Sequence, residues 1–252
     1  MQDPRETAPP GPDAPAASPP LVQVTGLVKV YQDEEHVPVR ALDGVDFTLE
    51  EGEFTAIAGP SGSGKTTLLN LIGGLDRPTE GRVVVAGQDL GRLSRGKLAE
   101  FRLYNVGFIF QSYNLLPVLD AVENAEFTLL LQGVPAEERR QRVERELADL
   151  GLGPELWHRR PAQLSGGQQQ RVAVARALVS RARLILADEP TANLDSKTGA
   201  RLLDKMKELN EKLGATFLFS THDPMVMERA RRLVRLRDGQ IVSDERREEP
   251  DA

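Results

Sequence analysis

The fold of this chain can be worked out from one segment, Gly59-Pro60-Ser61-Gly62-Ser63-Gly64-Lys65-Thr66-Thr67. The apolar run 54–58 precedes it and the segment 68–72, Leu-Leu-Asn-Leu-Ile, follows it, so a strand, a glycine loop and a helix are expected in that order. That order is the context in which the pattern G-x-x-x-x-G-K-[ST] binds phosphate. Glycines let the loop turn tightly and point its N–H groups inward, and the helix start adds further free N–H groups. The segment therefore predicts a nucleoside triphosphate site.

Individual roles within the loop follow from the chemistry of its side chains. Lys65 is expected to reach the β- and γ-phosphates, and the Thr66 hydroxyl to bind Mg²⁺. The other residues that we expect to contact the nucleotide are Gly59, Ser61, Gly62, Ser63, Gly64 and Thr67. The alternative is an ordinary glycine turn before a helix, which the order of strand, loop and helix around the full pattern disfavours.

Composition limits the class of protein. With 252 residues, 40% hydrophobic and 28% charged, the chain is long enough for a sizeable core and has the balance of a globular protein. A net charge of −6 does not favour binding to nucleic acid. The absence of cysteine excludes disulfides and thiolate metal sites. Since no signal-peptide pattern and no apolar run of about 18 residues is seen, a cytosolic protein is expected.

The ends of the chain differ from its middle. Residues 1–20 are rich in proline and carry no apolar cluster, so a disordered tail is predicted there. Residues 244–252 predict a short charged tail. A single folded domain is expected at 21–243, with helical patterns at 94–104, 120–132 and 136–150. The helix-rich part, about 112–175, is interpreted as an insertion into an α/β chain.

Polar side chains follow three apolar strand patterns. Gln111 ends the run 106–110, Asp188-Glu189 ends the run 184–187, and His222 comes shortly after the run 215–219. Ligands bind beyond the carboxyl ends of parallel strands, so these residues are candidates for one site. Asp188 is expected to hold the metal, Glu189 to act as general base, and Gln111 to contact Mg²⁺ or the attacking water.

Not all of these assignments are equally specific. A glutamine at a strand end is usually just solvated, and a lone histidine is more often structural than catalytic. At the end of a parallel strand, however, His222 is well placed to contact the γ-phosphate. Two adjacent acids closing an apolar strand are hard to explain without a bound cation, because an isolated buried carboxylate is costly.

Two further features accompany the loop. Ser165 precedes Gly166, Gly167 and Gln168 at a second glycine-rich helix start, which could bind an anion although no strand leads into it. Two phosphate cradles in one chain suggest a composite site that closes in a dimer. Tyr31 ends an early strand pattern, where it could stack on a purine or simply pack on the sheet edge.

Taken together, these residues resemble the nucleotide-binding subunit of ABC transporters over residues 21–243. The resemblance rests on Tyr31, the glycine loop, Gln111, Leu-Ser-Gly-Gly-Gln at 164–168, Asp188-Glu189, Asn-Leu-Asp at 193–195, and His222. The segments 110–117, 123–124 and 190–195 are similar to the macrolide-export and lipoprotein-release subgroup, with Ala192 where that subgroup usually has glycine. The resemblance implies a P-loop NTPase (RecA-like) α/β core with an antiparallel β subdomain and an inserted α-helical subdomain.

The resemblance also implies how such a protein works. Two copies would form a head-to-tail homodimer around two ATP and Mg²⁺, each ATP lying between one P-loop and the other chain's residues 165–168. Tyr31 would stack on adenine, Gln111 and His222 would sense the γ-phosphate, and Asp195 would communicate across the dimer. The helical insertion and Tyr113–Pro117 would receive short helices of an integral membrane permease, which would place the subunit on the inner face of the cell membrane.

Two other functions are compatible with an ABC-type ATPase. One is action on ribosomes or DNA, but proteins of that kind usually carry two cassettes or long coiled coils, and this chain has neither. The other is a regulatory module that uses slow hydrolysis as a timer. We therefore favour an ATPase that drives a separate permease.

Overall fold

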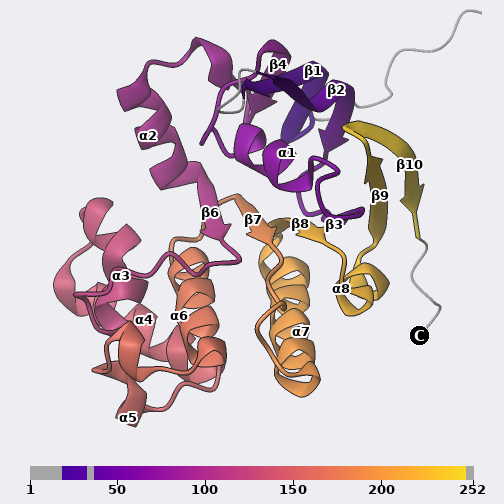
Figure 1. The fold of residues 1–252 in the computed structure, drawn as a ribbon. Coiled ribbons are helices and arrows are strands. Elements are labelled where there is room, and N and C mark those ends of the chain that lie inside the picture. Colours follow the sequence, from indigo (N-terminus) through magenta and orange to yellow (C-terminus); the bar gives the residue numbers. More distant parts are fainter. Residues whose placement is uncertain (1–18, 33–36, 248–252) are drawn as a thin grey trace, which may run out of the picture.

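The computed structural model describes residues 19–32 and 37–247, and their strands form two sheets (Figure 1). The strands are β1 (Val22–Gln32), β2 (Pro38–Leu49), β3 (Phe54–Ala58), β4 (Glu80–Val85), β5 (Gln88–Asp89), β6 (Val106–Ile109), β7 (Leu184–Asp188), β8 (Thr216–Thr221), β9 (Arg232–Arg237) and β10 (Gln240–Arg246). The smaller sheet has the order β2-β1-β4-β5 and is antiparallel. The larger has the order β10-β9-β3-β8-β7-β6.

The larger sheet is parallel from β9 to β6, and only β10 runs antiparallel to its neighbour. Its register aligns the carboxyl ends of the strands: Ala58 pairs with Thr221, and Asp188 pairs with Ser220. The loop after β3, the acids after β7 and the residues after β8 therefore meet at one edge, as expected for a ligand site in an α/β sheet.

Helices cover both faces of this sheet (Figure 1). They are α1 (Lys65–Ile72), α2 (Arg95–Asn105), α3 (Ala121–Leu131), α4 (Ala136–Asp149), α5 (Pro154–Trp157), α6 (Gly166–Val179), α7 (Ser196–Leu213) and α8 (Pro224–Arg229), with 3₁₀ turns at Leu90–Arg92 and Pro161–Gln163. Strand β3 is buried along its whole length, because alternate side chains enter two cores. Phe54 and Ala56 pack in the core that includes α6 and α7, whereas Ile57 packs in the core that includes α1 and the smaller sheet.

The predicted helical insertion is present as α3, α4, α5 and the start of α6, which lie together at one side of the molecule (Figure 1). The three helices predicted at 94–104, 120–132 and 136–150 end within one residue of α2, α3 and α4. Asn124, only 1% exposed, fixes the turn before α3: its side chain accepts from the Leu116 N–H at 2.7 Å and donates to the carbonyls of Leu116, Leu119 and Asp120.

The charged tail predicted from residue 244 begins later than expected. β10 continues through Arg246, while residues 248–252, and most of the proline-rich tail predicted at 1–20, lie outside the described residues. Within this added length, Asp244 accepts at 2.7 and 2.8 Å from Arg232, which is 6% exposed. Arg232 also donates to Glu53 at 2.8 Å. The charged segment thus pairs with β9 along its backbone, and the buried Arg232 binds its carboxylate at Asp244.

We expect Asp244→Asn to lower the free energy of unfolding by about 1–2 kcal/mol, since Asp244 is partly exposed and solvent screens the pair. Hydrogen bonding to Arg232, acting against burial, lowers the pKa of Asp244 below 3.8. Its stabilisation is therefore present at neutral pH and lost as the pH falls through that lowered value. Urea unfolding should show the two proteins converge at acid pH. Glu245→Gln, an exposed neighbour, is the control and should unfold as the wild type does.

Candidate active site

The glycine loop folds around the side chain of Lys65. Its ammonium donates to the carbonyls of Gly59 and Pro60 at 2.8 and 2.9 Å. Gly64 caps α1 with a φ of 102°, and a Cβ there would lie 2.4 Å from the carbonyl oxygen of Ala41. Only glycine fits this position, so the loop depends on it. The predicted order of strand, loop and helix is confirmed, with α1 beginning at Lys65.

A cavity of about 270 Å³ opens beside this loop at the carboxyl edge of the larger sheet. Its lining includes most of the residues that the sequence assigns to the nucleotide and its hydrolysis: Ser61, Gly62, Gly64, Lys65, Thr66, Thr67, Gln111, Glu189 and His222, together with Ala41. Gly59 contributes through its carbonyl, which accepts from Lys65. Ser63 is 2% exposed and does not line the cavity; its N–H donates to the Pro60 carbonyl at 3.3 Å, and its carbonyl accepts from the Gly239 N–H at 3.1 Å.

Thr66 and Asp188, distant in sequence, come together at this cavity. The Thr66 hydroxyl oxygen lies 3.1 and 3.0 Å from the two carboxylate oxygens of Asp188. A hydroxyl and a carboxylate are oxygen donors that suit Mg²⁺, which usually takes few protein ligands and completes its shell with water and phosphate oxygens. No group of three or more acidic, histidine or cysteine side chains suited to a metal occurs in the described residues, and this kind of site does not need one. The residues present fit Mg²⁺.

Glu189 combines burial with unusual backbone geometry. It is 8% exposed and has a φ of 48°, a left-handed conformation that costs a non-glycine residue about 1–3 kcal/mol. One carboxylate oxygen lies 2.6 Å from Nδ1 of His222, and the other accepts from the Thr221 hydroxyl at 3.3 Å. The carboxylate is therefore held in one orientation at the cavity. No sequence motif marks Thr221 as a site residue. Its position as the last residue of β8, paired with Ala58, is the signal that places it at the site.

The second glycine-rich helix start is formed as predicted, but lies elsewhere. Ser165 caps α6: its hydroxyl accepts from the Gln168 N–H at 3.3 Å, and the Gln168 side chain accepts from the Ser165 N–H at 2.8 Å. Space beside Gly166 is limited by the Tyr113 hydroxyl, and beside Gly167 by Leu194. Within the described part of the chain, residues 165–168 are not among those that line the 270 Å³ cavity.

The other predicted site residues lie around this framework. Asp195 caps α7 by accepting from the Thr198 N–H at 3.0 Å, and hydrogen bonds to Thr198 lower the pKa of its exposed carboxyl. Gln111 lines the cavity, while its carbonyl accepts from the Asn193 side chain at 3.2 Å. Tyr31 is 38% exposed on β1 and does not line the cavity itself.

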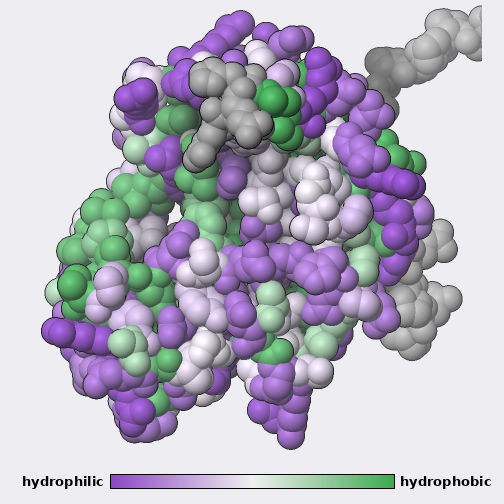
Figure 2. All heavy atoms as spheres, in the orientation of Figure 1, coloured by the Kyte–Doolittle hydropathy of each residue, from purple (hydrophilic) through white to green (hydrophobic). Residues whose placement is uncertain are grey.

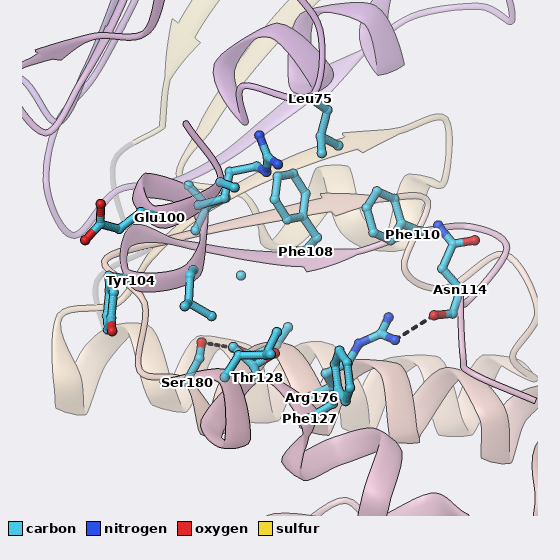
Figure 3. A pocket seen from close by; sticks show the side chains of 17 residues that line it. Leu75, Glu100, Tyr104, Phe108, Phe110, Asn114, Phe127, Thr128, Arg176 and Ser180 are labelled. Carbon is cyan, nitrogen blue, oxygen red and sulfur yellow. Dashed lines mark hydrogen bonds between the residues drawn. The ribbon is translucent and has the colours of Figure 1, made fainter. Parts of the chain in front are cut away.

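A larger cavity, of about 610 Å³, opens between α2, β6, α3 and α6 (Figure 3). Phe108 and Phe110 stack on one side of it, with ring centroids 5.3 Å apart. Exposed apolar side chains border it, and Figure 2 shows such side chains gathered at the left edge over α3. Of the segment Tyr113–Pro117, which the resemblance assigns to a permease-binding groove, only Asn114 lines this cavity, so that groove stays a prediction. The remainder comes from α2, β6, α3 and α6, together with Leu75, Phe110 and Ser180.

Comparison with known proteins identifies the family. Residues 42–192 match the sequence profile of the family described as ABC transporter. This chain belongs to the ABC transporter family. It is 49% identical over 227 residues to an uncharacterized ABC transporter ATP-binding protein of Thermotoga maritima, covering 90% of this chain and 96% of that protein. It is 50% identical over 227 residues to the macrolide export ATP-binding/permease protein MacB of Hyphomonas neptunium, covering 90% of this chain but 35% of that protein.

Solved structures agree with this ABC cassette in fold. A dimeric structure of the ATP-binding cassette MJ0796, in a post-hydrolysis state with ADP and Pi, has a TM-score of 0.87 and 42% identity, covering 91% of this chain and all of that one. The predicted fold, a P-loop NTPase core with an antiparallel β subdomain and a helical subdomain, is confirmed. The cassette is an ATP-binding domain of an ABC ATPase, with relatives named for macrolide export. None of the helices in the described part has the length and hydropathy needed to cross a bilayer.

Proposed function

We propose that this chain hydrolyses ATP as a head-to-tail homodimer and so drives a separate membrane permease. The observation that carries the proposal is that one cavity unites the residues for phosphate, metal and water. Lys65 lies in the loop, Thr66 meets Asp188, and Glu189 meets His222 at the same edge of the sheet. Thr66 and Asp188 are 122 residues apart in the sequence, and Glu189 and His222 are 33 apart, so the fold brings the members of each pair together.

In this proposal the residues divide the work of phosphoryl transfer to water. Loop N–H groups and Lys65 hold the phosphates, and Thr66 with Asp188 would hold Mg²⁺, which neutralises charge on the phosphate oxygens when it is bound. Glu189 takes the proton of the attacking water as general base. His222 keeps the carboxylate oriented through the 2.6 Å contact, so that the base does not have to reorganise during the reaction.

The dimer is proposed because the second cradle is separate from the first. Residues 165–168 form a capped helix start, yet they do not line the cavity beside the glycine loop within the described part of the chain. A second copy in head-to-tail arrangement would bring its own residues 165–168 over the nucleotide. The similar cassette MJ0796 is dimeric with ADP and Pi bound, which supports a homodimer.

The 610 Å³ groove supports a permease as the partner. It offers stacked aromatic rings and exposed leucines, which suit the apolar face of a short helix. Arg176, at the groove, donates to the carbonyls of Tyr113 and Asn114 at 2.8 and 2.6 Å, so the groove is joined to the turn that follows Gln111. A permease docked here would hold the subunit at the inner face of the cell membrane.

We expect Leu131→Asp to abolish capture of a permease while leaving ATP hydrolysis by the purified chain unchanged. Leu131 lines the groove and is 56% exposed, so a charge there would be desolvated by an apolar partner without disturbing the core. Tagged protein carrying Glu189→Gln, with ATP, is used to capture partners from detergent-solubilised native membranes. The captured proteins are identified by mass spectrometry.

Leu213→Asp is the matched control, because Leu213 is also the last residue of its helix and is 68% exposed, but lies away from the groove. A protein with membrane-spanning segments should be captured with this control and lost with Leu131→Asp. Equal capture by the two variants would contradict docking in the groove. Recovery of ribosomes or only of soluble proteins would favour the alternative function.

A further inference from the structure

Tyr31 presents one ring face outward. Lys29 lies two residues earlier on the same face of β1, and its ammonium is 4.7 Å from the centroid of the Tyr31 ring. The Lys29 side chain is only 12% exposed, whereas Tyr31 is 38% exposed. The covered face of the ring is therefore the one against the protein, held by a cation–π contact. Among the described residues, Lys29 is the only group in a ring or cation–π contact with Tyr31, so the opposite face can take another planar group.

Asp76 holds both residues at once. One of its carboxylate oxygens accepts from the Tyr31 hydroxyl at 2.8 Å, and the other accepts from the Lys29 ammonium at 2.9 Å. The Arg77 N–H donates to Asp76 at 2.7 Å, and Lys29 donates to the Arg77 carbonyl at 2.8 Å. Burial acts against ionisation here, but these hydrogen bonds lower the pKa of Asp76. Asp76 is thus an ionised acceptor at neutral pH.

The same helix connects this cluster to the phosphate loop. α1 begins at Lys65 in that loop, and the chain after its end turns back, with the Leu75 N–H donating to the Asn70 carbonyl at 2.8 Å. Eight helical residues span only about 12 Å, so Asp76 and the phosphate loop are fixed to opposite ends of one short rigid element. The Thr67 hydroxyl, near the start of α1, also bonds to the Tyr31 phenol.

We infer that Asp76 is a positioning residue for nucleotide recognition: it anchors the Tyr31 hydroxyl so that the ring forms a preformed stacking platform for the purine base. This inference rests on the proposed function, because it needs a nucleotide in the adjoining loop. A free tyrosine side chain would have to be immobilised when the base binds, and that costs affinity. The hydrogen bond from Tyr31 to Asp76 immobilises the side chain before the nucleotide binds, so this cost does not reduce the affinity. This hydrogen bond therefore contributes to binding of the base and leaves the contacts of the phosphates unchanged.

The experiment separates base from phosphate by comparing Mg·ATP with Mg·tripolyphosphate in calorimetric titrations. Asp76→Ala and Tyr31→Phe should each weaken ATP binding by about threefold to tenfold, the range expected for immobilising one side chain. Tripolyphosphate binding should stay as in the wild type for both. Because the two residues act through one hydrogen bond, the double variant should be no weaker than either single variant. Asp76→Asn, which keeps an acceptor oxygen, should recover part of the affinity.

Asp204→Ala is the control, since Asp204 on α7 pairs with Arg229 of α8 and lies outside the lining of the cavity beside the glycine loop. Equal loss of tripolyphosphate and ATP binding by Asp76→Ala would overturn the inference and leave Asp76 a purely structural residue. Additive losses in the double variant, or wild-type ATP affinity in Asp76→Ala, would also overturn it. Failure of the wild-type protein to bind Mg·ATP would instead refute the proposed function, so the two failures are distinguishable.

Discussion

Glu189→Gln is expected to bind ATP with wild-type affinity, to accumulate as an ATP-bound dimer, and to turn over at least tenfold more slowly. Removing a general base typically costs about 10²–10⁴-fold in rate, so the lower bound is cautious. Glutamine has the same shape, tolerates the same left-handed backbone about as well as glutamate, and can still accept a hydrogen bond from His222. What it cannot do is take a proton from water.

Steady-state phosphate release measures the rate, and light scattering with and without ATP measures the dimer. Glu228→Gln is the control, because it makes the same chemical change on an exposed residue of α8. Glu228 follows His222 in the sequence but does not line the cavity. If Glu189→Gln hydrolysed ATP at the wild-type rate, Glu189 would have no part in the mechanism. If it failed to bind ATP, the substitution would have disturbed the loop rather than the chemistry.

The sequence predicts those parts of the site in which a local pattern also determines where the residues lie in the fold. Residues 59–67 follow a strand and continue into the first turn of a helix, so their position in the chain fixes their position in space. Asp188, Glu189 and His222 follow apolar runs, and a parallel sheet brings such strand ends to one edge. The register that pairs Ala58 with Thr221 does so here.

Contacts between distant segments could not be predicted, because no sequence pattern connects those segments. Asp76 lies in a short loop after α1, and nothing local indicates that it bonds to Lys29 and Tyr31, some 45 residues earlier. The charged segment at 244–246 reads as a tail until the buried Arg232 is known to pair with it. The lining of the 610 Å³ cavity was likewise not predicted, because α2 and β6 approach α3 only in the folded chain. The sequence patterns considered above do not predict α7 at all.

Ser165→Arg is expected to abolish cooperative ATP hydrolysis while each monomer still binds nucleotide. Ser165 is not part of the cavity beside its own glycine loop, so binding by the monomer should be unaffected. In a head-to-tail dimer the arginine would project into the partner's nucleotide and clash with the loop that faces it. Cooperativity is measured from the dependence of ATPase rate on protein and ATP concentration, and binding from titration with a fluorescent ATP analogue.

Loss of the helix cap is the confounding effect, since Ser165 caps α6 and such a loss costs about 0.5–2 kcal/mol. Ser94→Arg is the matched control: Ser94 caps α2 by accepting from the Lys97 N–H, and it lies outside both cavities. It should lose comparable stability and keep its ATPase activity. Unchanged hydrolysis by Ser165→Arg would refute the composite site.

Mixing two inactive variants tests the composite site directly. Lys65→Ala lacks a working glycine loop and Ser165→Arg lacks a working second cradle, yet their heterodimer contains one complete site, built from the loop of one chain and the cradle of the other. If the two sites of a dimer act independently, an equal mixture with random pairing should recover about a quarter of wild-type activity. Half of the dimers are then heterodimers, and each heterodimer has one intact site out of two. A site formed within a single chain gives no recovery, so activity in the mixture can arise only if each ATP is held between two copies.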